Sequence, residues 1–138
     1  MKPISPEEAA LKMEEGYVYL DVRSVPEFES GHPKGAYNIP LMHVGRSGMT
    51  PNSKFMEEVV KAFPKDAKIV VGCKSAGRSL SAIGLLQMCG YKDILLQRAG
   101  FDGNGQEPGW GQTSLPQSTT AEPGRAYQDL KGSAFSGE

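Results

Sequence analysis

The apolar run at residues 68–72 (KIVVG) constrains the fold of this chain more than any other stretch. A strand that is apolar throughout, without polar alternation, is typical of a parallel sheet that helices cover on both faces. Residues 17–23 (YVYLDVR) have the same character until Asp21, which we expect at the carboxyl end of its strand. Residues 35–40 and 93–97 predict two further short strands.

Helix signals lie between and beside these strands, at residues 5–16, 24–31, 53–63 and 78–89. The first segment begins with Ser5, followed by Pro6 and, three residues after the serine, by Glu8, which together form the signature of a capped helix start. In the last segment, apolar residues recur at the spacing of one helical face. Strands that alternate with helices in this order predict an α/β sandwich around a mostly parallel sheet.

Length, charge and cysteine content narrow the functional classes. A chain of 138 residues suits one domain, and its 15 basic and 16 acidic residues exclude an overall field that would attract nucleic acid or an anionic membrane. Two cysteines and two histidines give neither a disulfide framework nor a structural metal site, so we expect no metal. The N-terminus lacks the apolar core of a signal peptide and no run approaches membrane-spanning length, so we expect a cytoplasmic protein.

The composition changes after Phe101. Eight of the seventeen glycines lie from Gly100 onward, mixed with glutamine, serine, threonine and proline. A segment of this kind offers little apolar surface for burial. We therefore expect a domain over residues 1–117 and a flexible C-terminal tail over residues 118–138, in which residues 126–130 form one helical turn at most.

Cys73 lies at the predicted carboxyl end of strand 68–72, where α/β proteins usually hold their ligands. Small or flexible residues follow it: Lys74, Ser75, Ala76 and Gly77. The helix that begins near Arg78 directs unpaired N–H groups and a partial positive charge at the same point, which favours a thiolate over a thiol. We expect Arg78 and Lys74 to add positive charge and to orient an oxyanion substrate. The sequence therefore predicts an anion cradle with a nucleophilic thiol at its floor.

The two cysteines invite different interpretations. The alternative for Cys73 is a small apolar side chain that closes a strand. Cys89 lies on the apolar face of the following helix, and there we prefer this structural interpretation, with a resolving thiol as the alternative.

Three segments together resemble the single-domain rhodanese (thiosulfate sulfurtransferase) family over residues 4–101: "YLDVRSVPEFESGHPKGAYNIP", "IVVGCKSAGRS" and "LLQMCGYKDILLQRAGF". The resemblance implies a three-layer sandwich whose mostly parallel central sheet has about five strands flanked by helices. It also implies a ping-pong reaction. In such a reaction Cys73 would attack the outer sulfur of a donor such as thiosulfate, become a persulfide without any cofactor, and pass the sulfur to cyanide or a thiol.

The resemblance assigns further roles residue by residue. The loop from Cys73 to Arg78 corresponds to the active-site loop, whose backbone N–H groups would hold the terminal sulfur. Supporting roles in the architecture around the site fall to Asp21, Arg23, Glu27 and His32, and Arg23 could pair with Glu27. Where the family commonly carries a glycine pair after the last strand, this chain has Ala99 and Gly100.

Two alternatives stay open. A phosphatase or arsenate reductase of the same fold would carry five residues between cysteine and arginine, whereas four intervene here, which favours a bound sulfur over a phosphate. A noncatalytic or redox-sensing rhodanese-like module is the second alternative, because an accessible thiolate also reacts with peroxide. As partners we expect a small-molecule sulfur donor and acceptor, with a protein thiol as a further acceptor, and a monomer with a dimer as the alternative.

Overall fold

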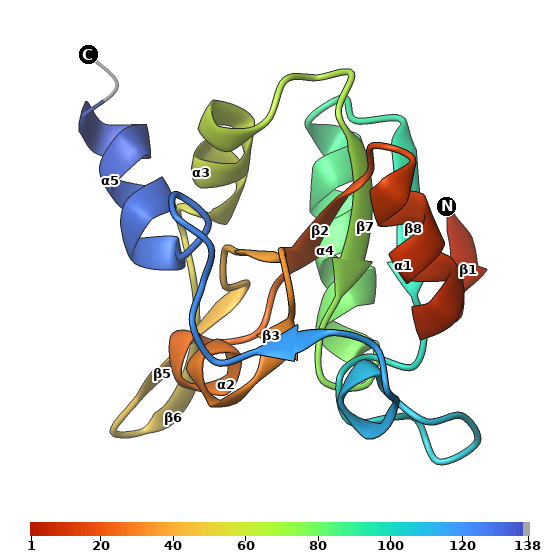
Figure 1. Ribbon diagram of the computed structural model, residues 1–138. Coiled ribbons are helices and arrows are strands. Elements are labelled where there is room, and N and C mark those ends of the chain that lie inside the picture. Colours follow the sequence, from red (N-terminus) through yellow and green to blue (C-terminus); the bar gives the residue numbers. More distant parts are fainter. Residues whose placement is uncertain (137–138) are drawn as a thin grey trace.

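The computed structural model describes residues 1–136 and the side chains of residues 1–131. Its centre is a five-stranded sheet in the order β1-β8-β7-β2-β4, in which every neighbouring pair is parallel (Figure 1). The strands are β1 (Lys2–Ile4), β2 (Val18–Asp21), β4 (Tyr37–Asn38), β7 (Lys68–Gly72) and β8 (Asp93–Gln97). This arrangement confirms the predicted α/β fold with a parallel central sheet.

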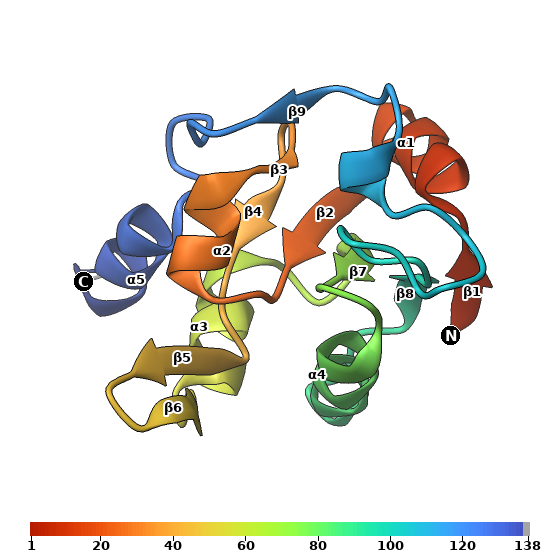
Figure 2. The same cartoon turned by 90° about the horizontal axis from the view of Figure 1, so that it is seen from below.

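Helices cover both faces of the sheet and complete three layers (Figure 2). One face carries α3 (Phe55–Ala62), α4 (Gly77–Met88) and α5 (Tyr127–Ser136). The other carries α1 (Pro6–Glu14), α2 (Val25–Ser30) and the 3-10 turn η1 (Trp110–Gln112). The start of α1 is capped as predicted: the Ser5 hydroxyl accepts the Glu8 N–H at 3.1 Å, and the Glu8 carboxylate accepts the Ser5 N–H at 2.9 Å.

The strands are apolar at successive positions because their side chains pack alternately into two separate hydrophobic cores. In β7, Ile69 and Val71 join the cluster beneath α3 and α4, whereas Val70 joins the cluster beneath α1 and α2. In β2, Leu20 and Tyr19 divide in the same way. Side chains of a strand point alternately to its two faces, so both faces of a covered sheet must be apolar.

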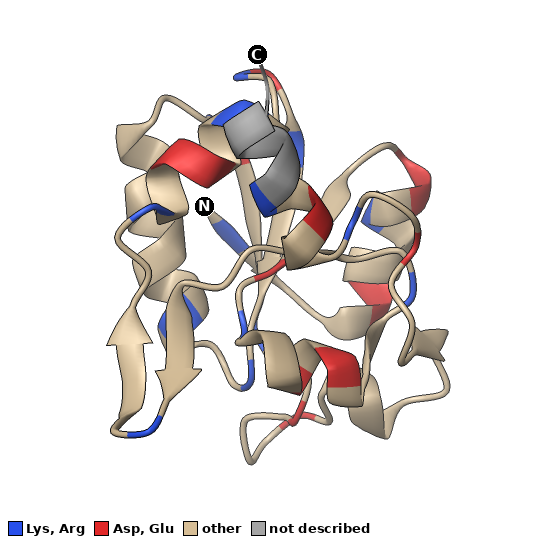
Figure 3. Ribbon diagram, turned by 90° about the vertical axis from the view of Figure 1, so that its left-hand side faces the viewer, with Lys and Arg blue, Asp and Glu red and all other residues tan. Residues whose placement is uncertain are grey.

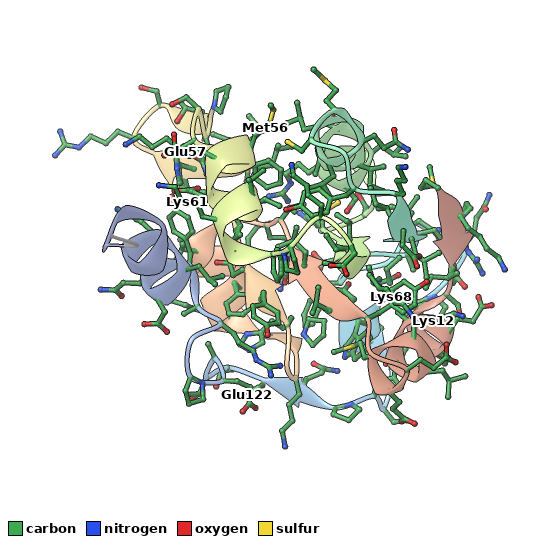
Figure 4. The ribbon with its side chains drawn as sticks, turned by 90° about the horizontal axis from the view of Figure 1, so that it is seen from above. Lys12, Met56, Glu57, Lys61, Lys68 and Glu122 are labelled. Carbon is green, nitrogen blue, oxygen red and sulfur yellow. The ribbon has the colours of Figure 1, made fainter. Side chains whose placement is uncertain are left out.

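Helix α3 shows its amphipathic design in the side chains. Phe55 and Val59 are buried in the core beneath the helix. Met56, Glu57 and Lys61 lie on the outer side of the helix (Figure 4).

Two small antiparallel pairs lie outside the central sheet. β5 (Met42–Gly45) and β6 (Gly48–Pro51) form a hairpin, and Gly48, with φ 102°, supplies the turn conformation that a tight hairpin needs. β3 (His32–Pro33) pairs with β9 (Gln117–Ser118). Basic and acidic residues are dispersed over the face that carries the hairpin (Figure 3), as the balanced net charge suggests.

The segment after Phe101 packs closely onto the domain, where its composition predicted loose attachment. Trp110 is buried and donates its indole N–H to the Pro116 carbonyl at 3.0 Å. The Tyr127 hydroxyl lies 2.7 Å from the Glu58 carboxylate, and α5 extends well beyond the single turn that we expected. Two aromatic anchors with satisfied polar ends thus fix a segment of polar composition. Residues 137 and 138 of the predicted tail lie outside the described residues.

Among the described residues, no group of side chains has the composition of a metal site. The helices there are also too short or too polar to cross a membrane.

Candidate active site

Cys73 follows directly on β7 at the carboxyl edge of the sheet, with Asp21 of β2 opposite Gly72. The position before the cysteine admits only glycine, since a Cβ at Gly72 would lie 2.0 Å from the Tyr19 hydroxyl oxygen. Burial raises the pKa of Tyr19, whose hydroxyl receives the Gln97 side-chain N–H at 3.2 Å. A neutral, hydrogen-bonded layer therefore supports the strand end that carries the thiol.

The sulfur of Cys73 lies inside the first turn of α4. It accepts backbone N–H groups from Ala76 at 3.2 Å and from Ser79 at 3.3 Å. The first N–H groups of a helix have no partner within the helix, and the positive end of the helix dipole lies at the same place. Two backbone N–H groups at the start of α4 therefore already hold the sulfur atom.

Ser79 did not enter the sequence prediction, which ended the loop at Arg78. Ser79 is fully buried, its N–H reaches the sulfur, and its hydroxyl oxygen has no hydrogen-bond partner. Its place in the first helical turn was the available signal, because the unpaired N–H groups of a helix extend over that whole turn.

Ala76 carries the backbone strain of the loop. Its φ of 133° makes it the one non-glycine with a positive φ in the described part of the chain. We expected glycine to provide flexibility at Gly77. However, Gly77 does not have a positive φ, and a Cβ added there would have no atom within 4 Å. L-residues rarely adopt the conformation of Ala76, so the surrounding contacts must hold it there.

Arg78 is bound to Glu27 of α2 in a bidentate ion pair, with N–O distances of 2.6 and 2.9 Å. The Ser24 hydroxyl and N–H also donate to Glu27, at 2.8 and 3.0 Å. Partial burial opposes ionisation, but the hydrogen bonds from Arg78 and Ser24 lower the pKa of Glu27 to about 2. The pair therefore ties the beginning of α4 to α2.

Arg23 pairs with Asp21 rather than with Glu27, the partner that the sequence offered. Both residues are buried, and the guanidinium contacts Asp21 at 2.7 Å and the Gly31 carbonyl at 2.7 Å. The guanidinium also lies over the Phe101 ring, 4.4 Å from its centre. Because their charges and hydrogen-bonding groups are paired with one another and with these neighbours, Arg23 and Asp21 are supporting residues that stabilise this edge of the sheet.

His32 is also a packing residue. Its Nδ1 atom is hydrogen-bonded to the Phe28 carbonyl at 2.7 Å, and its buried ring stacks on that of Phe28 with centroids 3.7 Å apart. These contacts fix the end of α2 against β3.

Residues 100–102 run along the back of the cysteine loop. The Cys73 carbonyl accepts the Phe101 N–H at 2.8 Å, and the Lys74 carbonyl accepts the Asp102 N–H at 3.0 Å. A Cβ at Gly100 would lie 2.3 Å from the Lys74 oxygen, so this is the glycine of the pair that the site requires. A hollow of about 260 Å³ opens beside the loop, lined by Lys74, Arg23 and Glu27 among others.

A sequence profile of the rhodanese-like domain matches residues 5–106. The chain belongs to the rhodanese-like domain family. It is 40% identical over 104 residues to thiosulfate sulfurtransferase 16, chloroplastic, of Arabidopsis thaliana, covering 73% of this chain and 79% of that protein. It is 34% identical over 117 residues to thiosulfate sulfurtransferase 18 of the same plant, covering 83% and 82%.

Other relatives extend beyond the matched region. Senescence-associated protein DIN1 of Raphanus sativus is 42% identical over 79 residues, which span 57% of this chain and 43% of that protein. Among solved structures, Rv0390 from M. tuberculosis superposes with a TM-score of 0.74 at 21% identity, covering 87% of this chain and 98% of that one. This likeness confirms the fold.

Within this rhodanese-like domain, the predicted site residues fall into two groups. Cys73 and Ala76 of the predicted loop meet at the sulfur, and the Glu27–Arg78 pair ties α4 to α2 beside it. Asp21, Arg23 and His32 lie in the supporting structure behind it.

Proposed function

We propose that this rhodanese-like domain is a sulfurtransferase, which moves sulfane sulfur from thiosulfate or a related donor to a thiophilic acceptor through a persulfide on Cys73. The observation that carries the proposal is the pair of backbone N–H groups, from Ala76 and Ser79, that point at the Cys73 sulfur. Donors aimed at an anionic sulfur stabilise the thiolate before attack and the developing charge during it.

The first half-reaction uses the thiolate of Cys73 as nucleophile. It attacks the outer sulfur of thiosulfate, a new S–S bond forms on Cys73, and the bond between the two thiosulfate sulfurs breaks. Sulfite leaves with the electron pair of that bond. In the second half-reaction the carbon of cyanide, or the sulfur of a thiolate, attacks the outer sulfur of the persulfide. The Cys73 thiolate is then released, so the cycle needs no cofactor and no metal.

The two basic residues of the loop, Lys74 and Arg78, have different roles in this reaction. Lys74 borders the hollow beside the loop and supplies a cation for an anionic donor. Arg78 is a positioning residue, because its guanidinium is engaged by Glu27 and holds the first turn of α4 in place. Four residues, not five, separate Cys73 from Arg78, and this shorter loop supports sulfur transfer over phosphate chemistry.

The test is a two-step reaction followed by mass and product. Purified protein incubated with thiosulfate is expected to gain one sulfur atom in mass, and cyanide is expected to remove it as thiocyanate. Cys73→Ser is expected to abolish both steps, whereas Cys89→Ser, the matched control, retains them. An unchanged mass in the wild-type protein would contradict the proposal, and a persulfide-free Cys73 that peroxide oxidises would favour the redox-sensing module.

A further inference from the structure

The outer face of α4 exposes large apolar side chains to solvent. Ala82, Ile83 and Leu86 lie on the inner face of the helix, in the core. Leu80 and Met88 lie on the outer face and are 50% and 76% exposed. Figure 2 shows α4 at the edge of the molecule, with the sheet on its inner side. Two such side chains on one face of an exposed helix are typical of a surface that contacts another molecule.

This outer face carries no charge. No charged residue lies between Arg78 and Lys92, so the exposed positions of α4 are glycine, serine, glutamine, leucine and methionine. The Arg78 guanidinium is itself bound by Glu27 of α2. On α1, by contrast, the exposed Leu11 shares its face with exposed glutamates, as is usual for a helix that faces water. A face without charge can be covered without burying an unpaired ion.

Gly84 lies midway between the two apolar side chains. A glycine inside a helix lowers the stability of the helix relative to alanine. The packing of the chain itself does not require glycine here, because an added Cβ would meet nothing within 4 Å and the φ of Gly84 is not positive. The close approach of a second helix backbone is a physical reason for glycine at such a position.

The three residues also form a two-fold pattern. Leu80, Gly84 and Met88 are spaced four apart, so they lie along one line on the helix surface. If a second α4 crosses this line in the antiparallel direction at Gly84, the two glycines face each other and each leucine meets the methionine of the other copy. Such a contact is isologous, because both copies use the same surface. It also brings opposite ends of the two helix dipoles together.

We propose that the outer face of α4 binds a second copy of this chain, in an antiparallel two-fold contact centred on Gly84. The absence of charge favours a second copy over an acidic or a basic partner, because an uncharged face is complementary to itself. Met56 and Val60 of α3, which covers the same face of the sheet, are exposed and add apolar surface on this side of the molecule. The inference does not rest on sulfur transfer, since these residues lie outside the cysteine loop.

Sedimentation of the full chain at about 1–500 µM measures the association. We expect the mass to rise towards twice the chain mass of 14.9 kDa. Leu80→Lys buries a charge in the contact and is expected to weaken association at least about tenfold. Leu11→Lys, on the exposed face of α1, is the matched control and should associate like the wild type. A wild-type monomer over the whole range, which would leave the face to a different partner, or unchanged association of Leu80→Lys would overturn the proposal.

A cross-linking experiment tests the two-fold geometry. In a chain that carries Cys73→Ser and Cys89→Ser, Gly84→Cys brings two thiols together at the axis, so mild oxidation with diamide is expected to link two copies by a disulfide. The structure has room for this side chain. Met88→Cys is the matched control: Met88 is exposed, but its expected neighbour in the other copy is Leu80, so little cross-linking should occur. Equal cross-linking of the two variants, or more from Met88→Cys, would contradict the proposed contact.

Discussion

The two cysteines of this chain lie at opposite ends of the same helix, and their surroundings differ accordingly. Cys73 precedes α4, is 2% exposed, and its sulfur accepts two N–H groups at the helix start. Cys89 caps the end of α4, where its own N–H bonds to the Leu85 and Leu86 carbonyls and its carbonyl accepts the Lys65 ammonium. Cys89 is the more exposed thiol. The thiol at the N-terminus of the helix, although it is less exposed, therefore has the N–H donors and the positive helix dipole that favour a nucleophile.

The largest expected effect on activity comes from substitution of Gly100, behind the Cys73 loop, and it is compared with substitution of Gly90, next to Cys89. At Gly100 an added Cβ would strike the backbone behind the Cys73 loop, so Gly100→Ala should reduce thiocyanate formation at least about 100-fold, because it displaces the sulfur cradle. At Gly90, next to Cys89, the nearest atom is the Lys65 Cδ at 3.9 Å. Gly90 also has a positive φ, so Gly90→Ala should cost about 1–2 kcal/mol of stability and leave activity intact. Equal loss of activity in the two variants would contradict the distinction.

An intermediate effect is expected from Glu27→Gln, which removes the anion that holds Arg78 at the start of α4. Turnover should fall about tenfold, since a neutral amide replaces a charge-assisted bidentate contact. Glu29→Gln, on the exposed side of the same helix, is the matched control and should retain full turnover.

The same pair predicts a pH dependence of stability. The pKa of Glu27 is lowered from 4.5 to about 2 in the folded chain. Its contribution is therefore fully present above pH 4.5 and is lost as the pH falls towards 2. Urea unfolding of wild-type and Glu27→Gln protein should show a stability difference that is constant above this window and shrinks through it. A difference that grows on acidification would contradict the ion pair.

The smallest expected effect concerns the strain at Ala76, which has no counterpart at Cys89, where φ is -80°. Glycine adopts a positive φ without the Cβ penalty, so Ala76→Gly should raise the free energy of unfolding by about 0.5–1 kcal/mol. Ala10→Gly, in the regular helix α1, should lower it by about 1 kcal/mol. Thermal or urea unfolding measures both changes, and the same sign in both variants would argue against strain at Ala76.

The sequence predicted the parts of this molecule that depend on local pattern. Strands β2, β7 and β8 are apolar because both faces of the sheet are covered. The start of α1 was predictable from its capping residues. Strand β1 was missed because Lys2 and Pro3 do not have the apolar pattern of a buried strand. Its position depends on pairing with β8, far along the chain. The packing of α5 was missed for the same kind of reason, because it depends on contacts such as that between Tyr127 and Glu58, 69 positions apart.

At the site, the cysteine and its loop were predictable because strand, loop and helix are consecutive. The pairing of Arg78 with Glu27, 51 positions away, and the approach of Gly100 to the loop are contacts between distant segments. Local spacing cannot choose between Arg23 and Arg78 as the partner of Glu27, since both arginines are near enough in the fold to compete for it. The strain at Ala76 also depends on the tertiary contacts around the loop.

The most direct measurement locates the transferred sulfur between the two cysteines. Wild-type protein is treated with thiosulfate, digested under non-reducing conditions, and its two cysteine-containing peptides are analysed by mass spectrometry. We predict one added sulfur per chain on the peptide that contains Cys73, with the Cys89 peptide unmodified despite its greater exposure. Sulfur on Cys89, on both peptides equally, or on neither would contradict the account.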